Sequence, residues 1–271
     1  MPVAITQVDA FTDKPFAGNP AAVCVLPEAR DAQWMQWIAR EMNLSETAFL
    51  VRQADGYNLR WFTPAIEVDL CGHATLASAH ALFAELGCAA QRITFETQSG
   101  PLIVERQGRG YRMDFPASPP RQIELPVGLA SALGAAPREV WAAQFLIALY
   151  DDEATVRKLS PDIGAIKQIA SAATQERGNV AVSALAAAGS AYDVVSRFFA
   201  PGSGIPEDPT TGALHTALAP LFCAKLGRPR LKFHQAYPGR GGDLECELRG
   251  DRVLIGGGAV TVAEGRLRVA L

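Results

Sequence analysis

The fold is decided by residues 60–83, RWFTPAIEVDLCGHATLASAHALF, and by a second stretch that resembles them, residues 197–222, RFFAPGSGIPEDPTTGALHTALAPLF. Both stretches run from an Arg–aromatic–Phe–x–Pro strand through a short turn into an Ala/Leu-rich helix. Arg60 and Arg197 are 137 positions apart, and the same offset relates Cys71 to Asp208. This agreement predicts an internal duplication, and so long a period indicates two similar domains rather than a solenoid.

The rest of the chain is consistent with two α+β domains. Short strands separated by Gly- and Pro-rich turns dominate both halves, with helices expected at 31–43, 72–86 and 209–226. The segment PASPPRQ (116–122) carries three prolines and is typical of a boundary. We therefore predict an N-terminal half of 1–118 and a C-terminal half of 119–271, with the last strand able to pack on the N-terminal half.

Composition excludes several classes of function. The net charge of −3 gives no reason to expect a nucleic-acid partner. No apolar run approaches the roughly 18 residues of a membrane helix, and the start, MPVAITQVDAF, lacks the pattern of a signal peptide. The five cysteines are scattered and odd in number, which predicts reduced thiols and a cytoplasmic protein. Neither GxGxxG after a strand nor a P-loop, HExxH or GxSxG motif occurs, so no cofactor is expected.

The duplicated helix starts are the natural place for a ligand. The first amides of a helix are unpaired and lie at the positive end of its dipole, so they bind carboxylate or phosphate. Gly72 and Gly212 would let a ligand approach each backbone closely. We predict a small anionic substrate, held in a cleft between the two halves.

Asp208 has two interpretations. Asp is favoured at a helix start, and Pro209 would suit the first helical position, so one interpretation is that Asp208 caps the helix. The other is a carboxylate that contacts a proton or an amino group of the substrate. Its counterpart in the repeat is Cys71, which caps poorly. A position that is Asp in one half and Cys in the other favours a chemical role.

Cys71 and His73 stand at the start of the other helix. A free cysteine is usually a small buried hydrophobe, but a helix N-terminus lowers its pKa and favours the thiolate. His73, in the first turn, is well placed for chemistry. No third and fourth ligand occurs at a suitable spacing, so no metal site is predicted. The other histidines, His80, His215 and His234, are interpreted as core or surface residues.

Glu46 lies in the segment NLSETAFL (43–50), between a helix and a strand. A capping or surface role is the default for such a residue. Its apolar neighbours would bury it in part, and burial raises the pKa of a carboxyl group towards the range that a general base requires. Both interpretations remain open from the residues alone.

Five segments together resemble the phenazine-biosynthesis PhzF-like proteins of the diaminopimelate epimerase superfamily. The resemblance runs from the first strand to the last. The segments are PFAGNPAAV (15–23), SETAFL (45–50), RWFTPAIEVDLCGHATLASAHAL (60–82), RFFAPGSGIPEDPTTGALHTALAPL (197–221) and GGGAVTVAEGRL (256–267).

The resemblance implies two pseudo-symmetric domains, each a β-barrel-like sheet wrapped around a central helix, with the active site in the cleft between them. It implies cofactor-independent isomerisation by proton transfer, and usually a homodimer. Glu46 matches the proton-shuttling glutamate, and His73 and Asp208 match the assisting residues. The expected substrate-binding residues are Asn19, Gly72, Ala74, Thr210, Thr211 and Gly212.

Two departures leave the substrate open. Ala213 stands where the family isomerase has a serine, and Cys71 stands where it has a small residue. In the amino-acid epimerases of the superfamily two cysteines face each other; Cys71 matches the first, and Asp208 replaces the second. The leading hypothesis is an isomerase of a small carboxylate-bearing metabolite with Glu46 as acid and base. The alternatives are a two-base epimerase using Cys71 and Asp208, and a non-catalytic binding protein of the same fold.

Overall fold

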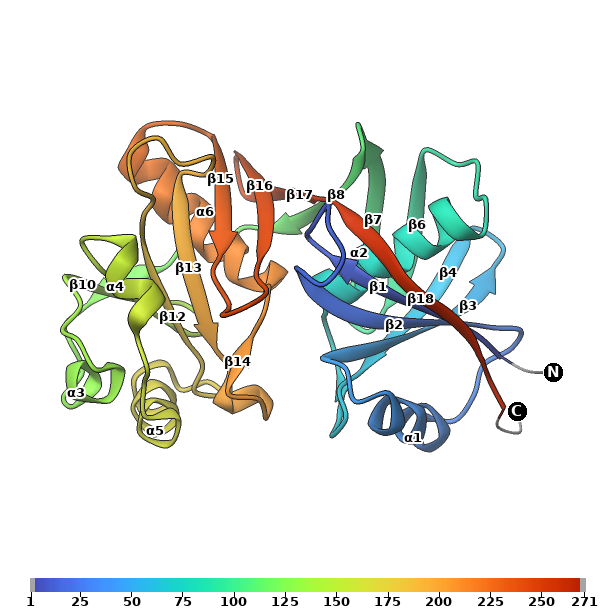
Figure 1. The fold of residues 1–271 in the computed structure, drawn as a ribbon, viewed down its shortest axis with the longest axis horizontal. Helices are drawn as coiled ribbons and strands as arrows, with labels where there is room; N and C mark the ends of the chain where they lie inside the picture. Colours follow the sequence, from blue (N-terminus) through green and yellow to red (C-terminus); the bar gives the residue numbers. More distant parts are fainter. Residues whose placement is uncertain (1–2, 269–271) are drawn as a thin grey trace. The chain divides into compact units, whose positions relative to one another are not determined.

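The computed structural model describes residues 3–268, and they form two compact units. The first unit holds the chain up to Phe115 and again from Leu254, and the second holds Pro116–Val253 (Figure 1). The chain thus leaves the first unit at the start of the proline-rich segment and returns to it for its last strands. The expected boundary after residue 118 lies three residues beyond the observed one.

The first unit is built mainly of strands. They are β1 (Val3–Ala10), β2 (Asn19–Leu26), β3 (Glu46–Gln53), β4 (Gly56–Phe62), β5 (Glu67–Val68), β6 (Arg92–Thr97), β7 (Gly100–Gln107), β8 (Gly110–Pro116) and β18 (Ala259–Leu267). The helices are α1 (Ala32–Met42), α2 (Gly72–His80) and the π-helical turn η1 (Ala81–Glu85). The sheet runs β18–β1–β2–β3–β4–β6–β7–β8, with β5 paired to β4.

The second unit has strands β9 (Arg121–Ile123), β10 (Glu139–Ala142), β11 (Leu146–Leu149), β12 (Val180–Leu185), β13 (Val194–Phe199), β14 (Glu207–Asp208), β15 (Arg230–Gln235) and β16 (Gly242–Arg249). Strand β17 (Arg252–Gly257) runs from the second unit into the first. The helices are α3 (Leu129–Leu133), α4 (Glu153–Lys158), α5 (Ile163–Thr174), the 3₁₀ turn η2 (Pro201–Ser203) and α6 (Gly212–Leu226). The sheet runs β9–β10–β11–β12–β13–β15–β16, with β14 paired to β13.

The two units have the same connectivity. After the first hairpin of each unit, the next three strand pairs are parallel, antiparallel and parallel. In the first unit these pairs are β2–β3, β3–β4 and β4–β6. In the second unit they are β11–β12, β12–β13 and β13–β15. Parallel neighbours need a crossover, and helices supply it at both places. The predicted α+β fold of two similar domains is confirmed.

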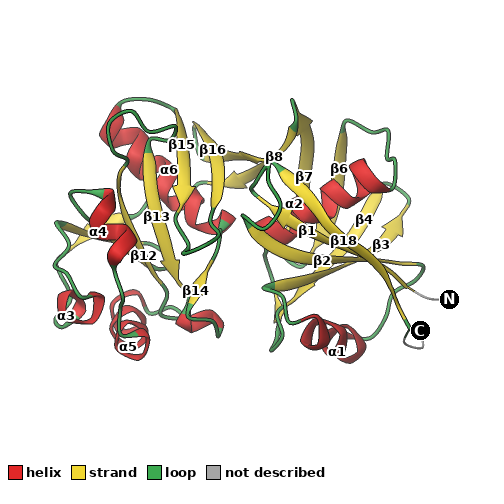
Figure 2. Cartoon of the chain, viewed as in Figure 1, coloured by secondary structure: helices red, strands yellow, loops and turns green. Residues whose placement is uncertain are grey.

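Helix α2 packs against the sheet of the first unit, and helix α6 packs against the sheet of the second (Figure 2). Every residue of α2 is buried, and α2 packs on β1, β2, β3 and β18. Helix α6 packs on β15 and β16. Neither helix has a polar face wide enough for a surface position, which is typical of a helix surrounded by the rest of its domain. The sheets therefore wrap around central helices.

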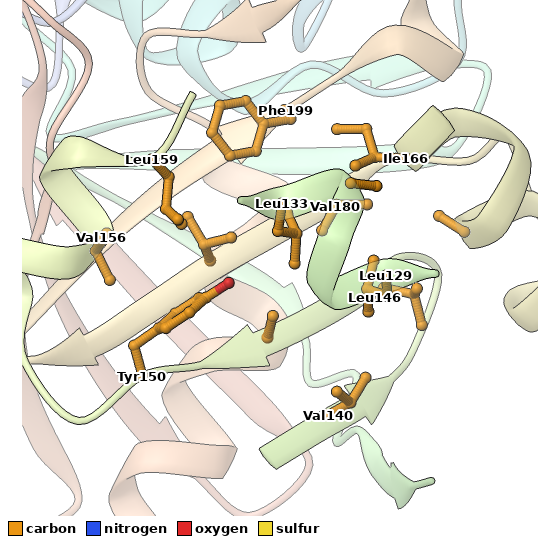
Figure 3. Close-up of a cluster of buried hydrophobic side chains, with 14 of the residues drawn as sticks. Leu129, Leu133, Val140, Leu146, Tyr150, Val156, Leu159, Ile166, Val180 and Phe199 are labelled. Carbon is orange, nitrogen blue, oxygen red and sulfur yellow. The ribbon is translucent and has the colours of Figure 1, made fainter. Parts of the chain in front are cut away.

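A separate apolar core fills the far side of the second unit's sheet. Leu133 from α3, Ile166 from α5 and Phe199 from β13 converge there (Figure 3). A smaller cluster in the first unit joins α1 to the sheet through Met35, Ile38 and Phe49. Trp37, on the same helix, lies outside this cluster and is 58% exposed.

Local differences from the expected elements have simple causes. Strands β10 and β11 form a short hairpin that turns between Ala142 and Leu146. Helix α6 begins at Gly212 rather than at residue 209, because Glu207 and Asp208 continue as strand β14 against β13. Within residues 3–268, no helix combines the length and apolarity needed to cross a lipid bilayer.

Candidate active site

Glu46 and His73 meet in the first unit. Glu46 is the first residue of β3, and His73 is the second residue of α2. The Oε2 atom of Glu46 lies 3.0 Å from Nε2 of His73, and their side chains are 17% and 4% exposed. Among the described residues, neither atom has a hydrogen-bond partner with good alignment, although the distance suits an ion pair. The pair therefore retains capacity to bind a further group.

Asn19 and Cys71 lie on the other side of the imidazole ring. Nδ1 of His73 is 3.2 Å from Nδ2 of Asn19 and 3.5 Å from Sγ of Cys71. In the neutral ring, Nδ1 accepts from the amide nitrogen or the thiol, and the proton is on Nε2, the nitrogen that faces Glu46. In the charged ring both nitrogens donate, and Sγ of Cys71 can accept from Nδ1.

The turn formed by PFAGNP places Asn19 beside the His73 ring. Gly18 precedes it with φ of +63°, and a Cβ atom at Gly18 would lie 2.1 Å from the carbonyl oxygen of Ala10. Only glycine tolerates both conditions. The side chain of Asp9 accepts a hydrogen bond from the amide of Phe16 at 2.8 Å and holds the same turn.

The electrostatics of the cluster favour a charged His73. Burial alone lowers the pKa of His73, but Cys71 and the Glu46 carboxylate together outweigh it and hold this pKa well above 6.5. The adjacent carboxylate is the physical cause that persists when Cys71 is a neutral thiol.

The expected thiolate at Cys71 is wrong. Burial, assisted by the negative charge of Glu46, raises the pKa of the Cys71 thiol to about 11, although His73 acts in the opposite direction. Cys71 is the N-cap residue of α2, as the sequence suggested, but its side chain makes no capping hydrogen bond. Desolvation therefore exceeds the effect of the helix dipole here.

Asp208 has a different setting in the second unit. It is buried in β14, paired with Phe198, and its Oδ2 accepts a hydrogen bond from the Thr211 hydroxyl at 2.5 Å. Thr211, not Asp208, is the N-cap residue of α6. The expected capping role of Asp208 is therefore wrong.

Gln235 makes hydrogen bonds to both ends of the segment between Asp208 and α6. Its Nε2 donates to the carbonyl oxygen of Asp208 at 2.7 Å, and its Oε1 accepts from the amide of Thr211 at 2.9 Å. The Thr211 amide is thus already engaged, which counts against the expected use of this amide for a substrate carboxylate. His215 adds a third restraint by donating from Nδ1 to the Thr211 carbonyl oxygen at 2.8 Å.

The remaining predicted binding residues lie at the two helix starts. Gly72 and Ala74 are buried in the first turn of α2, and Gly212 is the buried first residue of α6. The Thr210 hydroxyl is buried and donates to the carbonyl oxygen of Pro209 at 2.7 Å. The structure thus brings Asn19, Glu46, Cys71 and His73 together in one unit and groups Asp208 with Thr211 in the other.

The expected equivalence of Cys71 and Asp208 is also wrong. The strand pairs match Trp61 with Phe198 at an offset of 137, but they match Val68 with Asp208 at an offset of 140. The 3₁₀ turn η2 begins at the proline of the second copy and accommodates the extra residues. The N-cap residues Cys71 and Thr211 are the true counterparts.

A duplicated ion pair that sequence comparison missed supports the corrected register. Arg60 makes two bonds to the Glu67 carboxylate at 2.6 and 2.7 Å, and Arg197 makes two to Glu207 at 2.8 and 2.9 Å. Each pair ties the strand before the turn to the short strand after it. Aligning the two helix glycines, Gly72 with Gly212, would have revealed the matching glutamates. Gln235 carried no such signal, because it reaches this site from a distant strand.

Comparison with known proteins agrees with this architecture. The sequence profile of the PhzC-PhzF family, described as "Phenazine biosynthesis-like protein", matches residues 8–265. An "uncharacterized isomerase" of Pseudomonas aeruginosa is 47% identical and covers 99% of this chain and 100% of its own. The human "phenazine biosynthesis-like domain-containing protein" is 38% identical and covers 98% of this chain and 99% of its own.

Solved structures give the same result. A PhzF-family protein of Enterococcus faecalis superimposes with a TM-score of 0.92 at 40% identity, over 99% of this chain and 100% of its own. A probable proline racemase of Agrobacterium radiobacter shares the fold, with a TM-score of 0.65 at 15% identity, over 99% of this chain and 93% of its own. The fold is diaminopimelate epimerase-like, and the relatives named as isomerases support an isomerase. The chain belongs to the PhzF family of phenazine biosynthesis-like proteins.

Proposed function

We propose that this protein is an isomerase that moves a proton within a small carboxylate-bearing metabolite, with its own side chains as acid and base. The observation that carries the proposal is the Glu46–His73 pair, with Oε2 and Nε2 3.0 Å apart and neither atom in a well-aligned hydrogen bond within residues 3–268. A buried carboxylate beside an imidazole is suited to general acid–base catalysis.

In the proposed reaction Glu46 removes a proton from a carbon next to a carbonyl or unsaturated group. The C–H bond breaks, its electron pair moves into the neighbouring π system, and the proton passes to the Glu46 carboxylate. Glu46 then returns the proton to a different carbon. The Glu46 carboxylate raises the pKa of His73 and so favours its charged form, which would stabilise the negative charge that develops on the substrate.

Asp208 and the helix starts have supporting roles in this proposal. Asp208 would orient the substrate, and its carboxylate is held for this purpose by the Thr211 hydroxyl. The substrate carboxylate would bind at the first turn of α2, near Gly72, where helix amides are unpaired. Asn19 would fix the ring of His73 through Nδ1.

A two-base mechanism with Cys71 receives no support from the site. It requires a thiolate, whereas burial raises the pKa of Cys71 to about 11. It also requires Cys71 and Asp208 to be equivalent positions of the repeat, whereas the strand register makes Val68 the counterpart of Asp208. We assign Cys71 instead to the support of His73, through its contact with Nδ1.

Deuterium uptake tests the function without knowledge of the product. Small amino, hydroxy and unsaturated acids are incubated with the protein in heavy water and followed by NMR or mass spectrometry. For an acid that exchanges, Glu46→Gln should slow uptake by about 10²- to 10⁴-fold, the usual contribution of a general base. Glu41→Gln, on the exposed face of α1, is the matched control and should exchange normally.

Three other results would contradict the proposal. Uptake retained by Glu46→Gln would exclude Glu46 as the base. Uptake lost in Cys71→Ala, with the fold and the His73 resonance preserved, would favour the two-base mechanism. An acid that binds tightly but never exchanges in the wild-type protein would indicate the non-catalytic alternative.

A further inference from the structure

Glu46, Cys71 and His73 form a cluster of three different metal-ligating side chains. One donor atom from each, an oxygen, a sulfur and a nitrogen, can be chosen so that all lie within 4.8 Å of one another. Sequence spacing supplied only Cys71 and His73, and the third donor comes from another element. We propose that this cluster binds a thiophilic divalent cation of the Zn²⁺ type, which then blocks the site.

The donor set suits zinc. Thiolate, imidazole and carboxylate are the three side-chain ligands of Zn²⁺, with distances near 2.3 Å to sulfur and 2.0–2.1 Å to nitrogen. A tetrahedral ion with these bonds separates its sulfur and nitrogen ligands by about 3.6 Å. Sγ of Cys71 lies 3.5 Å from Nδ1 of His73. Two of the ligands therefore already have the required separation.

Rigid elements hold the donors. Cys71 and His73 are the N-cap and second residues of the fully buried helix α2, and Glu46 begins β3, on which that helix packs. Little ordering of side chains is needed on binding, which favours affinity. Oε2 of Glu46 has no well-aligned hydrogen bond among residues 3–268, so a cation would provide a partner for this buried oxygen.

The charges also balance. Binding breaks the S–H bond of Cys71, releases the proton to solvent and forms a metal–sulfur bond. One divalent cation, one thiolate, one carboxylate and one neutral imidazole sum to zero, which is favourable for a buried site. Because ligands must lose protons, affinity should increase with pH.

Three protein ligands leave one position of a tetrahedral ion open, for water or a donor of a small molecule. An ion at this place would occupy a Glu46 oxygen and a ring nitrogen of His73, so it would prevent proton transfer by these groups. The blocking effect rests on the proposed function, but the binding of the metal does not.

Cobalt substitution tests the binding directly. The metal-free protein is titrated with Co²⁺ alone, and the absorption spectrum is recorded for thiolate-to-cobalt charge transfer and for the visible bands of a tetrahedral ion. We expect one Co²⁺ per chain with a thiolate band, and full displacement by one equivalent of Zn²⁺. Affinity should rise between pH 6 and pH 8.

Cys71→Ser should abolish the thiolate band and weaken binding at least about tenfold. Glu46→Gln should weaken binding but keep the band, since it leaves the sulfur in place. The matched control is Cys88→Ser, which removes a free cysteine outside the cluster and should leave both unchanged. Circular dichroism verifies that each variant is folded.

The proposal is overturned if Co²⁺ produces no thiolate band, or if Cys71→Ser binds like the wild type. It is also overturned if Cys88→Ser, rather than Cys71→Ser, removes the band. A protein that binds Co²⁺ but exchanges no deuterium would refute the proposed function alone, whereas deuterium exchange insensitive to Zn²⁺ would refute the blocking effect.

Discussion

The carboxylate of Glu46 and the imidazole of His73 lie 3.0 Å apart although their residues are 27 positions apart on different elements. Strand β3 begins at Glu46 and helix α2 begins at Gly72, so the two element starts bring the pair together. Five consequences of this site and of the duplicated frame can be measured.

The Glu46–His73 pair should make stability depend on pH. The pKa of His73 is raised in the folded state. Its contribution to the free energy of unfolding is therefore complete below the pKa of the unfolded chain, near 6.5, and is lost as pH rises through the pKa of the folded state. Glu46→Gln removes the carboxylate and should lower the pKa of His73, measured from its ring resonances by NMR. The same variant should flatten this loss of stability above pH 6.5. An unchanged titration of His73 would show that Glu46 does not hold its proton.

His215 should have the opposite effect. Burial lowers its pKa to about 4, so the folded protein keeps His215 neutral while the unfolded chain binds a proton below about 6.5. Its contribution is therefore complete above pH 6.5 and is lost as pH falls towards 4, by about 3 kcal/mol. Urea unfolding of His215→Asn, whose amide can still donate to Thr211, should show a weaker loss between pH 7 and pH 4.5. Equal pH dependence of variant and wild type would contradict this.

Gln235 should stabilise the segment that carries Asp208. Gln235 is fully buried, and its removal leaves the Asp208 carbonyl and the Thr211 amide without these bonds. Each such loss costs about 1–3 kcal/mol, so Gln235→Ala should reduce the free energy of unfolding by at least 2 kcal/mol. The control Gln107→Ala, at an exposed position, should change it by less than about 0.5 kcal/mol. Equal effects of the two variants would show that the hydrogen bonds of Gln235 do not contribute to stability.

The two copies of the arginine–glutamate pair should differ in strength. The Arg197 side chain is 6% exposed and also donates to the carbonyl oxygens of Val156, Arg157 and Leu159, whereas the Arg60 side chain is 26% exposed. Arg197→Ala leaves the Glu207 carboxylate, whose side chain is only 13% exposed, without its partner and should cost about 3 kcal/mol. Arg60→Ala should cost about 1 kcal/mol or less. Denaturant unfolding of the two variants measures the difference, and similar values would refute the argument.

Cys71 should be an unreactive thiol. Its pKa is raised to about 11 and it is 6% exposed, whereas Cys88 is the free cysteine with intermediate exposure. Iodoacetamide at pH 8 should therefore label Cys88 well before Cys71, as followed by mass spectrometry of peptides. Labelling in urea provides the reference in which both react. Rapid labelling of Cys71 in the folded protein would revive the thiolate interpretation.

Local sequence patterns were enough to predict most of the two-domain fold. The repeated strand–turn–helix, the alternation of the strands and the proline-rich boundary predicted two similar α+β domains, because these signals depend on neighbours in the chain. The resemblance to a known family then pointed to Glu46 and His73, which the structure places in contact.

What the sequence by itself determined is therefore the duplicated fold and the residue types at the two helix starts. Only the tertiary structure decided the register of the repeat, since a turn that absorbs extra residues is invisible to a constant offset. It also decided the state of Cys71, because burial depends on everything packed around the thiol. The hydrogen bonds of Gln235 to the Asp208 segment also depend on the tertiary structure. Strand β15, which carries Gln235, follows α6 in the chain but pairs with β13 in the sheet, where Gln235 lies opposite Ser196.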